Sequence, residues 1–289
     1  MLLSLIFRNA FRHRLRTLLT VVGLTVAVLA FGLLSTVVEA WYAGAEGASN
    51  ARLIVRNSIS LVFPMPLTYR QKIRQIDGVK AISTANWFGG VYKEPKNFFP
   101  QFAVEASTYL DLYPEYVLGD VERKAFMRDR KGALVGEKLA ATYGFRLGDT
   151  VTLKGTIFPG QWEFVVRGIY SGRDAKTDVS QFFFHWEYLN ETMKIRVPRR
   201  ANQVGVYVVE VADPSRVAEI SLAIDSAFRN SNAETLTETE KAFQLGFVSM
   251  TEAIVVAIRL VSYLVIFIIL AVMANTIAMT VRERTAEYA

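Results

Sequence analysis

The two longest apolar patterns in the chain are runs without any charged residue, at residues 18–38 and 260–281. About 20 residues at ~1.5 Å rise each are enough for a helix to cross a hydrocarbon layer of ~30 Å. No run between them has a comparable length. The pattern therefore predicts two transmembrane helices, at 18–40 and 253–281, on either side of an outer domain at 41–252.

The segment between these runs combines strand and helix patterns. Strands are expected near 51–56, 79–87, 98–105 and 203–211, with a short last strand near 233–236. Helices are expected at 67–76 and after Asp213 and Pro214, which form an N-cap and first-turn pair. Without residues 107–202, this order is that of a ferredoxin-like split βαβ lobe, at about 50–106 and 203–236.

Residues 107–202 have a pattern of their own. A short strand is expected at 133–136, a helix at 137–143 with Gly144 as its C-cap, and paired strands at 151–153 and 162–169. The fold class is therefore α+β, with a small β-rich lobe inserted into the ferredoxin-like lobe.

From about Thr237 onward the pattern becomes helical and contains no proline. It predicts one helix over 238–281, about 66 Å long, whose first part, at about 237–252, is a stalk. Gly246 is its weak point.

Charge gives the orientation. The net charge is +6, from 33 basic and 27 acidic residues, and residues 1–17 contribute four arginines and no acid. By the positive-inside rule the N-terminus is cytoplasmic, and two spans return the C-terminus to the cytoplasm. Because the basic excess lies at this end, it is an orientation signal and indicates no nucleic-acid partner.

Arg8, Arg12 and Arg16 form a stripe beside an apolar arc, which predicts an amphipathic elbow helix at 1–17 in contact with membrane lipid. Trp41 and Tyr42 follow the first run, where an aromatic belt is expected. One alternative is an arginine-rich flank without fixed structure. Another is a cleaved signal peptide, although its apolar region is normally about 7–15 residues long.

The chain lacks the residues of several chemistries. It has no cysteine and two histidines, and contains no P-loop, dinucleotide-binding or nucleophile-elbow motif. We therefore expect no catalytic, cofactor-binding or metal site. His185 is expected to be structural, and Asp174 and Asp178 to be solvated loop charges rather than a cation site.

Four aromatic residues could form either an apolar ligand site or part of the domain core. They are Trp87, Phe88, Phe98 and Phe99. Core positions are the simpler interpretation.

Several stretches resemble the MacB/FtsX-like ABC transporter permease family. FRNAFRHRLRTLLT at 7–20 resembles its N-terminal elbow and first span. LVGEKLA at 134–140, LGDTV at 147–151 and FVVRGI at 164–169 are similar to its periplasmic core domain. NTIAM and VRERTAE, at 275–279 and 281–287, resemble the end of its second span and the start of its cytoplasmic coupling helix.

This resemblance implies a permease subunit in the cell (inner) membrane that works with a separate ABC-type ATPase and a second copy of itself or a homologous permease. ATP hydrolysis would occur on the partner, so this chain is not expected to be an enzyme. Motion would pass to a porter-like outer domain, for export or extraction of an unidentified substrate. A periplasmic membrane-fusion protein is a further partner in this family.

The family has four spans, so the resemblance also implies that this chain, with two, is an N-terminal fragment. It assigns ATPase coupling to Arg282, Glu283, Arg284 and Glu287, and residues 282–289 to the start of a truncated coupling helix.

Two other functions share this architecture. A membrane sensor also has a span, an outer ligand domain and a second span, although it would continue into a signalling domain. A regulator of cell-wall hydrolases would bind a hydrolase on its outer surface.

Overall fold

The computed structural model describes residues 48–250 and 252–287, together with residues 18, 21, 22, 25, 26, 28, 29, 31–33 and 36. The chain divides into two compact units. One contains residues 44–244, and the other contains residues 1–43 and 245–289. Each is described here by itself.

Strands make up the centre of the 44–244 unit. Their bounds are β1 (Arg52–Asn57), β2 (Met65–Pro66), β3 (Val79–Trp87), β4 (Gly90–Val91), β5 (Gln101–Val104), β6 (Tyr116–Val117), β7 (Gly132–Gly136), β8 (Thr150–Gly155), β9 (Gly160–Gly172), β10 (Phe182–His185), β11 (Gln203–Val204), β12 (Val206–Val211) and β13 (Thr235–Thr239). Within the described residues, eleven strands form one sheet in the order β13-β1-β12-β3-β5-β10-β7-β9-β8-β4, with β6 paired to β9.

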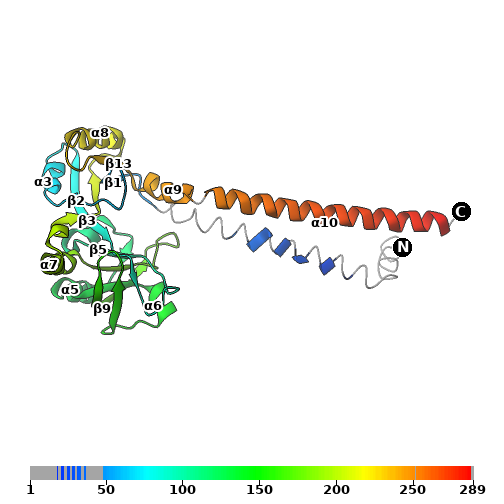
Figure 1. Ribbon diagram of the computed structural model, residues 1–289, viewed down its shortest axis with the longest axis horizontal. Helices are drawn as coiled ribbons and strands as arrows, with labels where there is room; N and C mark the ends of the chain where they lie inside the picture. Colours follow the sequence, from blue (N-terminus) through cyan, green and yellow to red (C-terminus); the bar gives the residue numbers. More distant parts are fainter. Residues whose placement is uncertain are drawn as a thin grey trace. The chain divides into compact units, whose positions relative to one another are not determined.

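One end of this sheet is ferredoxin-like. Its strands β1, β3, β12 and β13 lie in the order β13-β1-β12-β3, all pairs antiparallel. Helix α3 (Tyr69–Arg74) lies between β1 and β3 in the chain, and α8 (Val217–Ala227) lies between β12 and β13 (Figure 1). Asp213 accepts a hydrogen bond from the Ser215 backbone N–H, as expected of an N-cap. The predicted split βαβ order is therefore confirmed.

The inserted segment continues the same sheet. β5 pairs with β3, and β10, β7, β9 and β8 follow it. This segment contains more helix than a small β-rich lobe. Its helices are α4 (Ala106–Leu112), α5 (Asp120–Arg128), α6 (Glu137–Tyr143) and α7 (Trp186–Arg196). Of these, only α6 was predicted.

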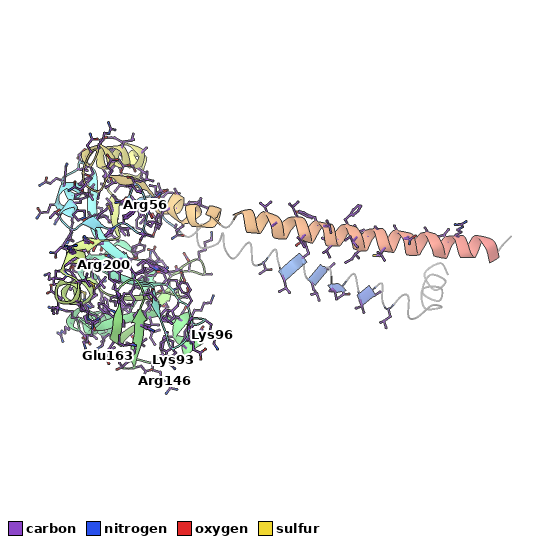
Figure 2. The ribbon with its side chains drawn as sticks, in the orientation of Figure 1. Arg56, Lys93, Lys96, Arg146, Glu163 and Arg200 are labelled. Carbon is purple, nitrogen blue, oxygen red and sulfur yellow. The ribbon has the colours of Figure 1, made fainter. Side chains whose placement is uncertain are left out.

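Helices cover both faces of the sheet, so the unit has two apolar cores. Buried residues of α3, α6, α7 and α8 belong to the first core. Buried residues of α4 and α5, together with Phe243, belong to the second. Three consecutive phenylalanines of β10 serve both, since Phe182 and Phe184 face the first core and Phe183 the second. Charged side chains such as Arg146 and Glu163 point outward (Figure 2).

The predicted single helix over 238–281 is wrong at its start. Residues Thr235–Thr239 form strand β13, in which Thr237 pairs with Val55 of β1. Helix α9 then spans Glu240–Met250 and helix α10 spans Glu252–Glu287. Thr251, between them, lies outside the described residues.

Helix α10 exposes large apolar side chains over most of its surface. Leu260, Tyr263 and Phe267 are among them, at 63%, 59% and 71% exposed. A narrower stripe, with Ser262 buried and Ile266, Ile269 and Met273 half-buried, recurs at helical spacing. The ring of Phe31, from the first apolar run, lies 6.1 Å from that of Tyr263.

Judged by length and mean hydropathy, no helix within the described residues qualifies as a membrane span.

Two positions beside α6 require glycine, each for a different structural reason. Gly144 ends the helix with φ +71°, the left-handed conformation of a C-cap, and has open space around it. Gly136 has an ordinary φ of −67°, but a Cβ there would lie 2.0 Å from the Val179 carbonyl oxygen. That carbonyl also accepts hydrogen bonds from the backbone N–H groups of Lys138 and Leu139.

We therefore expect Gly136→Ala to destabilise the fold by about 3 kcal/mol, because backbone must move to relieve the overlap. Gly144→Ala should cost only about 1 kcal/mol, for a left-handed backbone without a clash. Urea unfolding of both variants measures the difference. A larger loss in Gly144→Ala than in Gly136→Ala would contradict the assignment.

Candidate functional site

The site begins with a charged residue at the first position of a buried strand. Leu53 and Val55 of β1 face the first core, and Ile54 faces the second. Because side chains alternate along a strand, Arg52 lies on the side of Ile54. Its side chain is buried, with 8% of the residue exposed. A buried guanidinium needs partners for its N–H groups and its charge.

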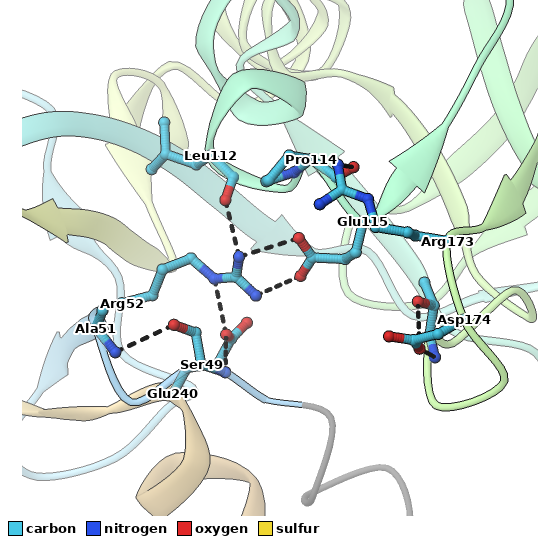
Figure 3. A network of polar contacts seen from close by, with 10 residues as sticks. Ser49, Ala51, Arg52, Leu112, Pro114, Glu115, Arg173, Asp174 and Glu240 are labelled. Atoms are coloured by element: carbon cyan, nitrogen blue, oxygen red, sulfur yellow. Dashed lines mark hydrogen bonds and ion pairs between the residues drawn. The ribbon is translucent and has the colours of Figure 1, made fainter.

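Two other segments supply these partners (Figure 3). Arg52 Nε donates to Glu240 Oε2 at 2.8 Å. Arg52 Nη1 donates to the Leu112 carbonyl oxygen at 2.9 Å and to Glu115 Oε2 at 3.1 Å. Arg52 Nη2 donates to the other oxygen of Glu115. One guanidinium thus joins the start of β1, the turn after α4 and the start of α9.

The turn that carries Glu115 is attached to the inserted part of the sheet. It leads into β6, where Tyr116 pairs with Gly172 of β9. The Arg173 backbone N–H donates to the Glu115 carbonyl oxygen at 2.9 Å. Arg52 therefore connects the ferredoxin-like end of the sheet to the end of β9.

Glu240 connects the two chain ends of the 44–244 unit. It is the first residue of α9, where the helix dipole favours a negative side chain. Besides Arg52, its Oε2 accepts the backbone N–H of Ser49 at 3.1 Å. Phe243, one turn later, packs against the second core. The segments that enter and leave this unit are thus joined at one carboxylate.

The surroundings of Arg52 favour its charged form. Burial alone would lower the pKa of the guanidinium, but the Glu115 hydrogen bond and the charge of Glu240 raise it overall. The Arg52 Cζ atom also lies 4.2 Å from the centre of the Tyr113 ring. Burial raises the pKa of Tyr113 well above its ordinary value, so this ring is a neutral phenol.

The arrangement is suited to holding segments together rather than to catalysis. It has no nucleophile paired with a base, and its arginine cannot give up its proton at neutral pH. Within the described parts of the chain, no group of three His, Cys, Asp or Glu residues is placed to bind a metal ion.

The structure places the predicted coupling residues in the last turns of α10. Arg282 is exposed, and Glu283 and Glu287 are one helical turn apart. The side chains of Glu283, Arg284 and Glu287 lie outside what the structure describes. So do the predicted membrane-interface residues Arg8, Arg12, Arg16, Trp41 and Tyr42. These assignments stay predictions.

His185 has a structural role, as predicted. It is 6% exposed, its Nε2 lies 2.8 Å from the Phe126 carbonyl oxygen, and its ring packs 4.3 Å from that of Phe126. Asp174 and Asp178 are exposed and accept hydrogen bonds from the backbone N–H groups of their own loop. Hydrogen bonds from Lys176 and Thr177 lower the pKa of Asp174.

The prediction that four aromatic residues lie in the core is confirmed for two of them. Phe88 and Phe99 are buried, whereas Trp87 and Phe98 are 41% and 61% exposed. Their ring centres lie 6.0 Å apart at the surface.

The Arg52 site itself was not predicted from the sequence. The only local signal is an arginine next to Leu53-Ile54-Val55, a strand whose residues are apolar on both faces. Its partner Glu240 is 188 residues away, and no spacing rule connects positions so far apart.

Comparison with known proteins gives a family match. The model of the MacB-like periplasmic core domain matches residues 17–227. No curated protein matches the chain at a significant level.

Solved structures give weaker likenesses. The periplasmic region of MacB from Actinobacillus actinomycetemcomitans is 12% identical, with a TM-score of 0.47, covering 70% of this chain and 94% of that one. The extracellular domain of the noncanonic ABC-type transporter YknZ from Gram-positive bacteria is 11% identical, with a TM-score of 0.45, covering 65% and 100%. Because both TM-scores lie below 0.5, the family assignment rests on the family model.

We expect Arg52→Leu to lower the free energy of unfolding by about 3 kcal/mol, because the buried carboxylate of Glu240 and the partly exposed carboxylate of Glu115 lose their cation. Arg56→Leu is the matched control. Arg56, labelled in Figure 2, lies four residues further along β1. It pairs with Glu238 at 2.7 Å, but both side chains are partly exposed. Its loss should cost about 1 kcal/mol or less. Equal losses in urea unfolding would show that the Arg52 network contributes no more than an ordinary surface pair.

Proposed function

The chain belongs to the family of MacB-like periplasmic core domains, and from this we propose that it acts as the membrane subunit of an ABC transporter of the permease type. Its partner would be a separate ABC-type ATPase, which hydrolyses the ATP. The 44–244 unit would lie outside the cytoplasm, and the chain would transmit motion to it for export or extraction of a substrate.

The observation that carries this proposal is the junction at Arg52 and Glu240. Glu240 joins the segment that follows the first apolar run to the segment that precedes α10. A displacement of either segment would therefore reach the sheet through this carboxylate, as well as through the backbone of β13 and the packing of Phe243. Such a connection is needed if the 44–244 unit is moved by force on its flanking segments, rather than by a ligand that binds to the unit itself.

Membrane insertion is supported by the apolar surface. The uncharged runs at 18–38 and 260–281 have the length of spans. The exposed apolar side chains of α10 cover more of the helix than one partner helix could bury, so we propose that lipid and a second copy of the chain, or a homologous permease, cover the rest. Arg8, Arg12 and Arg16 would lie in the cytoplasmic headgroup layer.

The cytoplasmic end is the proposed contact with the ATPase. Arg282, Glu283, Arg284 and Glu287 place four charges directly after the second apolar run, where they would leave the hydrocarbon. Charged residues at the rim of an interface set its register more than its affinity.

The topology has a direct test. A reporter enzyme that is active only outside the cytoplasm should be active when fused at residue 150 and inactive when fused at residue 289. A reporter that works only in the cytoplasm should give the opposite result. Cytoplasmic activity at residue 150 would refute the proposed function.

The coupling residues have a second test, in which the permease is co-expressed with its ATPase. Glu283→Arg combined with Glu287→Arg should abolish co-purification with the ATPase without reducing membrane insertion, because both charges lie on one face of the helix. Glu137→Arg combined with Glu163→Arg reverses two exposed glutamates of the 44–244 unit and serves as the control. Undiminished capture of the ATPase by the first variant would show that Glu283 and Glu287 are only a solvated helix end.

A further inference from the structure

The three partners of Arg52 do not hold it equally. Glu115 accepts from both terminal nitrogens, and the Leu112 carbonyl oxygen accepts from one of them. Glu240 accepts only one hydrogen bond from Arg52, donated by Nε. A two-pronged pair fixes both the distance and the orientation of the guanidinium, and a single hydrogen bond fixes only the distance.

The backbones that carry the two glutamates also differ. The Glu115 segment is held by the β6–β9 pairing and by the Arg173 backbone N–H. Glu240 directly follows β13, whose last residue Thr239 pairs with Leu53 of β1. Beyond that strand, α9 is attached to the 44–244 unit by the Glu240 carboxylate and by the packing of Phe243. After that turn the chain continues toward α10.

The charges favour separation of one partner. One guanidinium faces two carboxylates, of which Glu240 is buried and Glu115 partly exposed, so the site carries an excess of one negative charge. If Glu240 leaves, Arg52 and Glu115 remain as a balanced pair that keeps its hydrogen bonds, while Arg52 Nε and the Ser49 N–H lose their acceptor. The departing carboxylate gains water and stays at the N-terminus of α9, where the helix dipole favours it.

We propose that the Arg52–Glu240 pair is a releasable latch between the sheet and α9, and that the Arg52–Glu115 pair is the fixed part on which it closes. In the closed state Glu240 holds the Ser49 segment and Arg52 together. In the open state the first turn of α9, with Phe243, separates from the second core, and Arg52 stays on Glu115. The source of the force that would open the latch rests on the proposed function; the latch itself does not.

The latch can be tested by distance measurement, since the chain contains no cysteine of its own. Spin labels at Ala242→Cys on α9 and Ala223→Cys on α8, both exposed positions, report the separation of α9 from the sheet. The otherwise unchanged chain should give one narrow distance distribution. Glu240→Gln should shift part of the distribution to longer distances, whereas Glu115→Gln should leave it unchanged.

Glu238→Gln is the matched control, because it removes a charge from a neighbouring pair on the same strands. The proposal is overturned if Glu240→Gln leaves the distance unchanged, or if Glu115→Gln or Glu238→Gln shifts it equally. Labels at Ala223→Cys and Glu163→Cys check that the sheet is intact. If Glu240→Gln also changes the 223–163 distance, the test is repeated with Glu240→Asp, whose shorter side chain keeps the charge. Glu240→Asp must then give the shift to longer 223–242 distances.

These measurements do not need the ATPase. A failed latch would therefore leave the proposed transport function standing, and a refuted topology would leave the latch standing.

Discussion

A buried guanidinium is the constraint on which the arrangement of the 44–244 unit depends. Arg52 cannot be buried without acceptors for its N–H groups, and those acceptors come from a turn in the insert and from the start of α9. The same requirement brings the two chain ends of the unit together at Glu240. The ferredoxin-like strands, the insert and the outgoing helix therefore meet at one side chain, in addition to the β3–β5 pairing and the backbone link from β13 to α9.

The sheet places the insert where it can take part in this junction. A register shift in the β7–β9 pairing moves the partner of Leu134 to Gly168, so the side chains of β9 change faces beyond it. Phe164 and Val166 therefore pack in the first core and Tyr170 in the second. From there Tyr170 contacts Tyr116, the first residue of β6, with ring centres 5.0 Å apart. One irregularity in a strand thus brings β6 and Glu115 toward Arg52.

Local patterns predicted the elements that depend on neighbouring residues. Strand β3 and helix α6, with Gly144 as its C-cap, lie where alternation and capping rules place them. The rules failed at Thr237, where a strand formed through pairing with Val55, and at Arg52, whose acceptors are distant in sequence. A pairing across 182 or more residues depends on the assembled sheet, and no local pattern encodes it. The family resemblance, in contrast, was readable from short stretches such as LVGEKLA.

Hydrogen exchange of the intact chain, compared with an Arg52→Met variant, tests most directly whether one side chain joins these three segments. If it does, backbone exchange should accelerate together in residues 48–52, in the turn at 112–117 and in the first turn of α9. Exchange in α6 and β8, which have no contact with the network, should stay unchanged. Acceleration confined to β1, with the turn and α9 as protected as before, would contradict the account.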